Sequence, residues 1–162
     1  MAGILVLAEH QQGALSDITW ELLGVGRKLA DAQGVPLHSA LIGEGSSDVA
    51  SQLGAADQVL IAEHPALNSP STDVSAKVLG KMVEDKDISL VILGVTNISM
   101  GVGSSLSVVL RRPLVNFCTN AKVEQNAISF TAQLMGGKIL CDVQLPENRA
   151  IVCVNPGSFP AE

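Results

Sequence analysis

The sequence contains few aromatic residues. Only 2% of its 162 residues are aromatic, namely one Trp and three Phe, and there is no Tyr. Proteins that stack nucleic-acid bases or flavin rings usually supply aromatic side chains for that purpose. The composition therefore argues against a stacking platform on this chain.

Charge is also scarce. Charged residues make up 16% of the chain, hydrophobic residues make up 47%, and the net charge is −6. A nucleic-acid binder usually shows a basic face, whereas the basic residues here are scattered along the chain, and Arg111-Arg112 is a single adjacent arginine pair. We therefore expect no nucleic-acid partner. The apolar composition predicts a folded chain, and the low charge favours a surface that a partner partly covers.

Cysteine usage and the lack of long apolar runs indicate the compartment. Cys118, Cys141 and Cys153 are odd in number, match no metal-binding spacing and lie in apolar, strand-like segments. This pattern predicts buried free thiols in a reducing compartment. No basic leader is visible, and no apolar run approaches the ~20 residues that span a bilayer. The expected location is cytoplasmic, without membrane insertion.

Strand-like and helix-like segments alternate through the first two thirds of the chain. Residues 3–8 form a continuous apolar run, typical of a strand buried on both faces of a parallel sheet. Further strands are predicted at residues 36–42, 58–62, 88–93 and 114–118, with helical segments between them. The alternation predicts an α/β fold: one three-layer, Rossmann-like domain over residues 1–162, with a mainly parallel sheet and right-handed crossovers.

The pattern changes after residue 120. Short connections join strand-like segments, which are too close for helical crossovers but suit hairpins. These segments cover residues 122–124, 129–133, 139–145 and 150–154. We predict that all of them form a C-terminal antiparallel meander that extends the parallel sheet.

Two polar segments follow predicted strands and are candidate binding sites. Glu9 and His10 follow the first strand, where open α/β sheets bind ligands, and Glu63 and His64 repeat the dipeptide after the third strand. The plain alternative for both dipeptides is a surface loop without a ligand.

The loop over residues 94–103 is the second candidate. It follows a strand and precedes a helix, so polar groups there are placed to bind an anion at the helix N-terminus. The candidate residues are Gly94, Thr96, Asn97, Gly101 and Ser104. The loop contains only a GxG, because the third glycine of a dinucleotide fingerprint is missing. The alternative is a polar loop that caps its helix or contacts a partner.

No set of residues in the sequence predicts catalysis. The three histidines have no metal-ligand spacing, and no nucleophile is paired with a base. We therefore expect a binding or assembly module and not an enzyme.

Three stretches resemble the N-terminal domain of electron-transfer flavoprotein alpha subunits. They are ILVLAEHQQGALSDITWELL at residues 4–23, LVILGVT at residues 90–96 and GGKILCDVQLPENRAIVCVNPGSFPAE at residues 136–162. The resemblance implies an α/β domain related to adenine-nucleotide-binding folds, which pairs pseudo-symmetrically with a beta subunit. The family binds FAD on a further, C-terminal domain. The resemblance therefore implies no cofactor on this chain alone, with FAD or AMP held in a partner subunit.

The chain departs from the family pattern at polar positions. Ser99-Met100 and Ser104-Ser105 stand where the family carries Gly-Lys and Pro-Arg, so two cationic donors that suit phosphate are missing. This favours a non-catalytic docking and assembly module of a flavin-dependent electron-transfer complex. Its expected partner is a beta-like subunit or a dehydrogenase. A stand-alone adenine-nucleotide-binding module is the alternative, and a homodimer is a further one.

Overall fold

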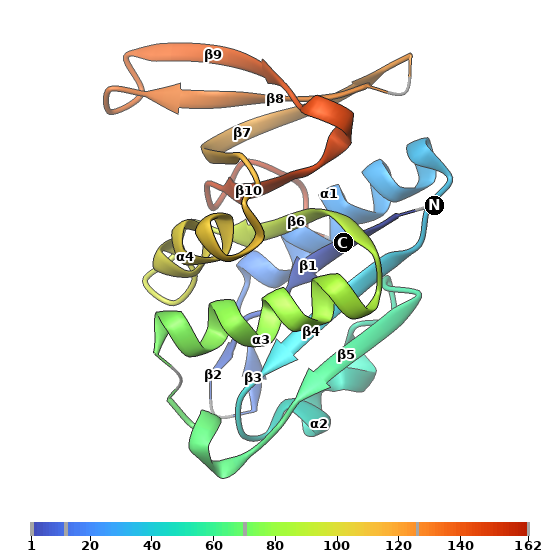
Figure 1. The fold of residues 1–162 in the computed structure, drawn as a ribbon, viewed down its shortest axis with the longest axis vertical. Helices are drawn as coiled ribbons and strands as arrows, with labels where there is room; N and C mark the ends of the chain where they lie inside the picture. The colour runs from blue at the N-terminus through green and yellow to red at the C-terminus, as the bar shows by residue number, and fades with distance from the viewer. Residues whose placement is uncertain (1, 12, 70, 126, 162) are drawn as a thin grey trace.

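The centre of the fold is an eight-stranded sheet, seen here in a computed structural model that describes residues 2–11, 13–69, 71–125 and 127–161 (Figure 1). The strand order is β5-β4-β1-β6-β10-β7-β8-β9. The strands are β1 (Gly3–Leu7), β4 (Leu37–Ile42), β5 (Gln58–Ala62), β6 (Ile88–Gly94), β7 (Leu114–Glu124), β8 (Ala127–Leu134), β9 (Ile139–Gln144) and β10 (Ala150–Val154). A small separate hairpin pairs β2 (His10–Gln11) with β3 (Ala14–Leu15).

Helices cover both faces of the sheet. The helices are α1 (Ile18–Gln33), α2 (Ser46–Val49), α3 (Thr72–Asp85) and α4 (Met100–Leu110), with 3-10 turns η1 (Ala50–Gln52), η2 (Pro65–Leu67) and η3 (Pro146–Asn148). One buried cluster joins α1 and α2 to the sheet, and another joins α3 and α4 to its opposite face. The predicted α/β fold with three layers is therefore confirmed.

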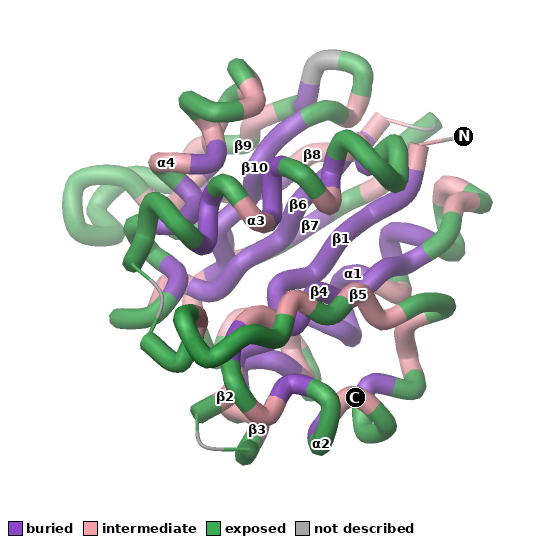
Figure 2. Tube along the Cα trace, turned by 60° about the horizontal axis from the view of Figure 1, so that its bottom comes forward, coloured by how far each residue is buried: buried purple, intermediate pink, exposed green. Residues whose placement is uncertain are grey.

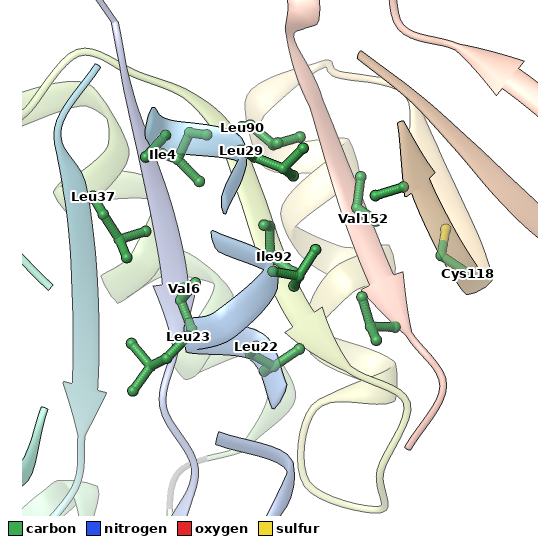
Figure 3. Packing of buried hydrophobic residues seen from close by; sticks show 14 of the residues in the cluster. Ile4, Val6, Leu22, Leu23, Leu29, Leu37, Leu90, Ile92, Cys118 and Val152 are labelled. Atoms are coloured by element: carbon green, nitrogen blue, oxygen red, sulfur yellow. The ribbon is translucent and has the colours of Figure 1, made fainter. Parts of the chain in front are cut away.

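Helix α1 shows how the sequence builds one of these layers. Its apolar stripe places Leu22, Leu23 and Leu29 on the face that packs against the strands (Figure 3). The helix ends at Gly34, whose φ of 62° lies in the left-handed region that glycine adopts at low cost. Burial of these leucines, at roughly 1.5–3 kcal/mol each, stabilises the layer far more than helix propensity does.

The parallel core is shielded on both sides, as the tube coloured by burial shows (Figure 2). All five residues of β1 and of β10 are buried. Strands that are buried on both faces have continuous apolar sequences. The apolar run at residues 3–8 predicts such a strand, and the complete burial of β1 confirms this prediction.

Strand β10 corrects one part of the predicted topology. It lies between β6 and β7 and is parallel to both: Ile151 is opposite Val91 on one side and Leu114 on the other. The prediction that residues 150–154 belong to the antiparallel meander is therefore wrong. A fully apolar strand is more stable in the double-covered centre of the sheet than at an edge. The antiparallel meander itself is confirmed and consists of β7, β8 and β9.

The helices of the described residues were compared with the length and hydropathy of a membrane span. None of their helices is both long and apolar enough to cross a lipid bilayer.

Candidate functional site

The topology brings the two candidate segments together. Strand β1 leads into α1 on one face of the sheet, and its neighbour β6 leads into α4 on the other face. The two connections diverge at the carboxyl ends of these strands, which is where open α/β sheets bind ligands. Residues 8–11 and 95–99 meet at this point.

Glu9 turns inward from the end of β1. Its side chain is 3% exposed, and Thr96 Oγ1 donates to its carboxylate at 2.9 Å while Ser99 Oγ donates at 2.6 Å. Burial raises the pKa of the Glu9 carboxyl, and the hydrogen bonds from Ser99 and Thr96 oppose that rise. The Thr96 hydroxyl, which was predicted to bind an external anion, therefore donates to a carboxyl group of the protein itself.

Gly94 makes room for this carboxylate. A Cβ at residue 94 would lie 2.9 Å from Glu9 Oε1 and 2.9 Å from Ile18 Cγ1. Any larger residue would push the carboxyl or helix α1 away. Gly94 is thus a packing position beneath the loop, and its backbone does not line the cleft described below.

The backbone amides at the start of α4 are also engaged. Thr96 Oγ1 accepts hydrogen bonds from Ile98 N at 3.2 Å and from Ser99 N at 3.1 Å. Met100 N donates to Thr96 O, and Val102 N donates to Ser99 O. An anion that approached this helix end would have to compete with these internal acceptors.

His10 is fixed by contacts with the end of β4. Its Nε2 lies 3.2 Å from Ile42 O and 3.0 Å from Ser46 Oγ, and that hydroxyl donates its own hydrogen to Gly43 O at 2.8 Å. Both neighbours of Nε2 therefore act as acceptors, which assigns the ring proton to Nε2. Nδ1 is buried and has no hydrogen-bond partner within the described residues.

The second acidic dipeptide caps short helical turns. The Glu63 carboxylate accepts hydrogen bonds from Gly45 N, Ser47 N and the Ser47 hydroxyl. The Ser47 hydroxyl first, and then these backbone amides, lower the pKa of Glu63. His64 Nδ1 accepts from Ala66 N at 3.1 Å and caps η2. Both side chains thus have structural partners.

A cleft of about 1070 Å³ opens beside the ends of β1 and β4. Of the predicted site residues, Glu9, His10 and Asn97 line it, whereas Gly94, Thr96, Gly101 and Ser104 do not. Glu44 and Asp48 also line the cleft, and no Lys or Arg is among its described lining residues. The cleft is therefore acidic.

Gly101 and Ser104 serve a different part of the fold. A Cβ at Gly101 would lie 3.1 Å from Thr72 Cγ2, so this glycine lets α4 pass close to the start of α3. Ser104 is exposed on α4. Both residues were predicted to share a site with Thr96 because they are near it in the chain. They belong to helix α4, however, and neither lines the cleft.

Glu44 and Asp48 line the cleft although they were not among the predicted site residues. The sequence does contain a signal that could have identified Glu44. Gly43-Glu44-Gly45 directly follows a predicted strand, and the carboxyl ends of parallel strands share one edge of the sheet. Glu44 belongs to the cleft for the same reason as Glu9.

The start of α4 and the acidic residues of the cleft do not fit the pyrophosphate of FAD or another nucleotide. Phosphate sites usually offer free amide donors and cationic side chains. Here the Thr96 and Ser99 hydroxyls and the amides at the start of α4 are engaged within the protein, and carboxylates line the cleft. In the part of the chain that the structure describes, no three His, Cys, Asp or Glu residues gather into a metal site either.

Comparison with known proteins shows which family the chain belongs to. The chain is 32% identical to protein FixB of Clostridium saccharobutylicum, over 97% of this chain and 48% of the relative. It is 32% identical to electron transfer flavoprotein subunit alpha of Megasphaera elsdenii, over 91% of this chain and 45% of the relative. It is 34% identical to acryloyl-CoA reductase electron transfer subunit beta of Anaerotignum propionicum, over 76% and 34%.

The chain spans about half the length of the first two relatives. The electron transfer flavoprotein domain family matches residues 4–162. Because that match runs through nearly the whole sequence, the chain belongs to the electron transfer flavoprotein domain family.

Proposed function

We propose that this chain is an alpha-type docking and assembly module of a flavin-dependent electron-transfer complex, and that it catalyses no reaction itself. The observation that carries the proposal is the family match over residues 4–162, together with relatives that are named as electron transfer subunits. The proposed partner is a beta-type electron transfer flavoprotein subunit or a dehydrogenase, since one relative is a subunit of a lactate dehydrogenase.

The proposal assigns no cofactor to this chain alone and leaves FAD or AMP to a partner subunit. The acidic cleft and the internally bonded loop at residues 94–99 support this assignment. A phosphate group would enter a region with three carboxylates and no nearby cation among the described lining residues, so Coulomb repulsion would oppose it. The same observation counts against a stand-alone adenine-nucleotide-binding module.

The proposed location is the cytoplasm. Its support is the presence of three free cysteines, of which two are buried, as is usual in a reducing compartment.

Co-expression tests the proposal directly. The chain would be produced alone and together with a beta-type subunit from the same genome, and each preparation would be analysed by size-exclusion chromatography with light scattering and by its visible spectrum. We expect a colourless protein from the chain alone and a stable complex in the co-expression. A yellow preparation of the chain alone, or failure to bind beta-type and dehydrogenase subunits, would overturn it.

Titration calorimetry tests the cofactor assignment separately. AMP, ATP and FAD at millimolar concentration are expected to give no binding heat with the isolated chain. Saturable heat with any of them would restore the nucleotide-binding alternative.

A further inference from the structure

The cleft beside the ends of β1 and β4 has the size and the place of a small-molecule site. Its volume is about 1070 Å³, and ligand pockets commonly measure about 300–1,000 Å³. Segments that are far apart in the sequence line it, namely those around His10, Glu44 and Asn68, together with the start of α4. The cleft therefore depends on the tertiary structure and lies at the carboxyl edge of the sheet, where α/β folds bind ligands.

The charge in the cleft is negative and lacks a counter-ion. Glu44 and Asp48 are exposed, line the cleft just after β4, and their carboxylates form no hydrogen bond or salt bridge within the described residues. His10 adds no positive charge, because Nε2 carries its proton and a second proton on the buried Nδ1 would have no acceptor among those residues. Coulomb attraction in this cleft therefore favours a cation.

A buried hydroxyl indicates a ligand independently of the charge. Ser75 of α3 is only 7% exposed, yet it lines the cleft. In the part of the chain that the structure describes, its Oγ has no hydrogen-bond partner. Side-chain polar groups at this depth nearly always have one. The Ser75 hydroxyl is therefore available to accept a hydrogen bond from a donor that enters the cleft.

The spread of these groups suits an extended cation better than a metal ion. Among the described residues, no three His, Cys, Asp or Glu side chains gather closely enough to hold a metal. Leu7, Ile42 and Leu67 add apolar surface to the lining. An aliphatic chain that carries separate ammonium groups can bond to separate acceptors and cover this apolar surface at the same time.

We propose that this cleft binds an aliphatic polyamine. Glu44 and Asp48 accept charge-assisted hydrogen bonds from its ammonium groups, the Ser75 hydroxyl accepts a further one, and the methylene chain packs on the apolar lining. Glu9 is not needed as a direct contact, because its carboxylate already accepts hydrogen bonds within the protein. The inference rests on the cleft and does not depend on the proposed docking function.

Titration calorimetry with spermidine tests the proposal. It would be done at low ionic strength, where charges at the protein surface are least screened. The wild-type protein should bind one spermidine with a Kd below about 1 mM. Mg²⁺, a compact cation, should give no saturable heat under the same conditions. The absence of saturable heat with spermidine up to about 10 mM, or equally tight binding of Mg²⁺, would overturn the proposal.

A pair of charge-neutralising variants locates the site. Glu44→Gln combined with Asp48→Asn should weaken spermidine binding about tenfold, since it removes two ion pairs. Glu84→Gln combined with Glu147→Gln is the matched control: it removes the same charge from exposed residues that do not line the cleft, and it should bind like the wild type. Equal weakening by both pairs would show attraction to the net charge of the chain only, which would contradict a site in the cleft.

Ser75→Ala tests the buried hydroxyl. It should weaken spermidine binding about fivefold, the effect of one lost hydrogen bond. It should leave the midpoint of urea unfolding unchanged, because the hydroxyl has no partner within the described residues. Ser104→Ala, on the exposed part of α4 outside the cleft, should bind like the wild type. Unchanged affinity of Ser75→Ala would overturn the proposed position of the ligand.

Discussion

The Glu9 carboxylate lies directly against Gly94, with Oε1 only 2.9 Å from the position that a Cβ at residue 94 would occupy. This contact joins the ends of β1 and β6 at the point where their connections diverge. The carboxylate replaces an external anion at the start of α4, because Thr96 and Ser99 donate to it. At this position the Thr96 and Ser99 hydroxyls therefore already have an acceptor within the protein.

Gly94→Ala should therefore destabilise the protein. The added methyl group would meet Glu9 Oε1 and Ile18 Cγ1 in a buried position, and overpacking of this kind costs about 1–3 kcal/mol. Urea denaturation would measure the loss in the free energy of unfolding. Gly54→Ala is the matched control, because a Cβ there meets nothing within 4 Å, and it should not destabilise the protein. Equal stability of the two variants would contradict this account.

The stability contribution of Glu9 should depend on pH. Burial raises its pKa above the ordinary value of 4.5, so the folded protein holds the proton more tightly than the unfolded chain does. The free energy of unfolding of the wild type, relative to Glu9→Gln, should be greatest below pH 4.5 and should fall as the pH rises through the raised native pKa. Urea unfolding of both proteins between about pH 4 and 7 would measure this difference. A difference that grows with pH would refute it.

Glu21 should hold the C-terminal segment on helix α1. Its carboxylate accepts hydrogen bonds from three consecutive amides, those of Gly157 at 2.8 Å, Ser158 at 3.0 Å and Phe159 at 3.2 Å. Glu21→Ala should cost about 1 kcal/mol in stability and raise hydrogen exchange at these amides.

Exchange measured by mass spectrometry would report the effect of Glu21→Ala, with Glu124→Ala on the exposed part of β7 as the control. Unchanged protection of residues 157–159 would show that the packing of Phe159 is sufficient to hold the segment.

The three cysteines should differ sharply in reactivity. Burial raises the pKa of Cys118 and of Cys153 to about 12, so neither is ionised near neutral pH, whereas Cys141 is partly exposed. A thiol reagent such as DTNB should modify one thiol rapidly in the native protein and all three after denaturation. Cys141→Ser should abolish the rapid phase, and a rapid phase that persists would contradict the assignment.

The strands of the parallel core and the main helices were predictable because their signals are local. The run at residues 3–8 is apolar throughout, and α1 ends at a glycine, Gly34, which is a common signal for a helix end. Ser71 likewise accepts a hydrogen bond from Val74 N at the start of α3, and serine is one of the residue types that commonly cap a helix in this way.

The position of strand β10 was not predictable from the short connection before it, because a short connection does not require a hairpin. Residues 146–149 are short enough for a hairpin, yet the chain turns there at η3 and returns to the centre of the sheet. The segment AIVCV contained the better signal, since all five residues are apolar, as in β1. The alternation in β8, which is buried on one face only, marks a meander strand instead.

The amino-acid sequence alone determined the class of the fold and the family resemblance, because composition, apolar periodicity and residue order do not depend on knowing which segments touch. Only the tertiary structure decided that the polar loop at residues 94–99 binds the protein's own Glu9, and that Glu44 lines the cleft while Ser104 does not. The physical reason is that a hydrogen-bond donor is free for a ligand only when no internal acceptor reaches it. That condition depends on residues about ninety positions apart in the chain meeting at one edge of a sheet.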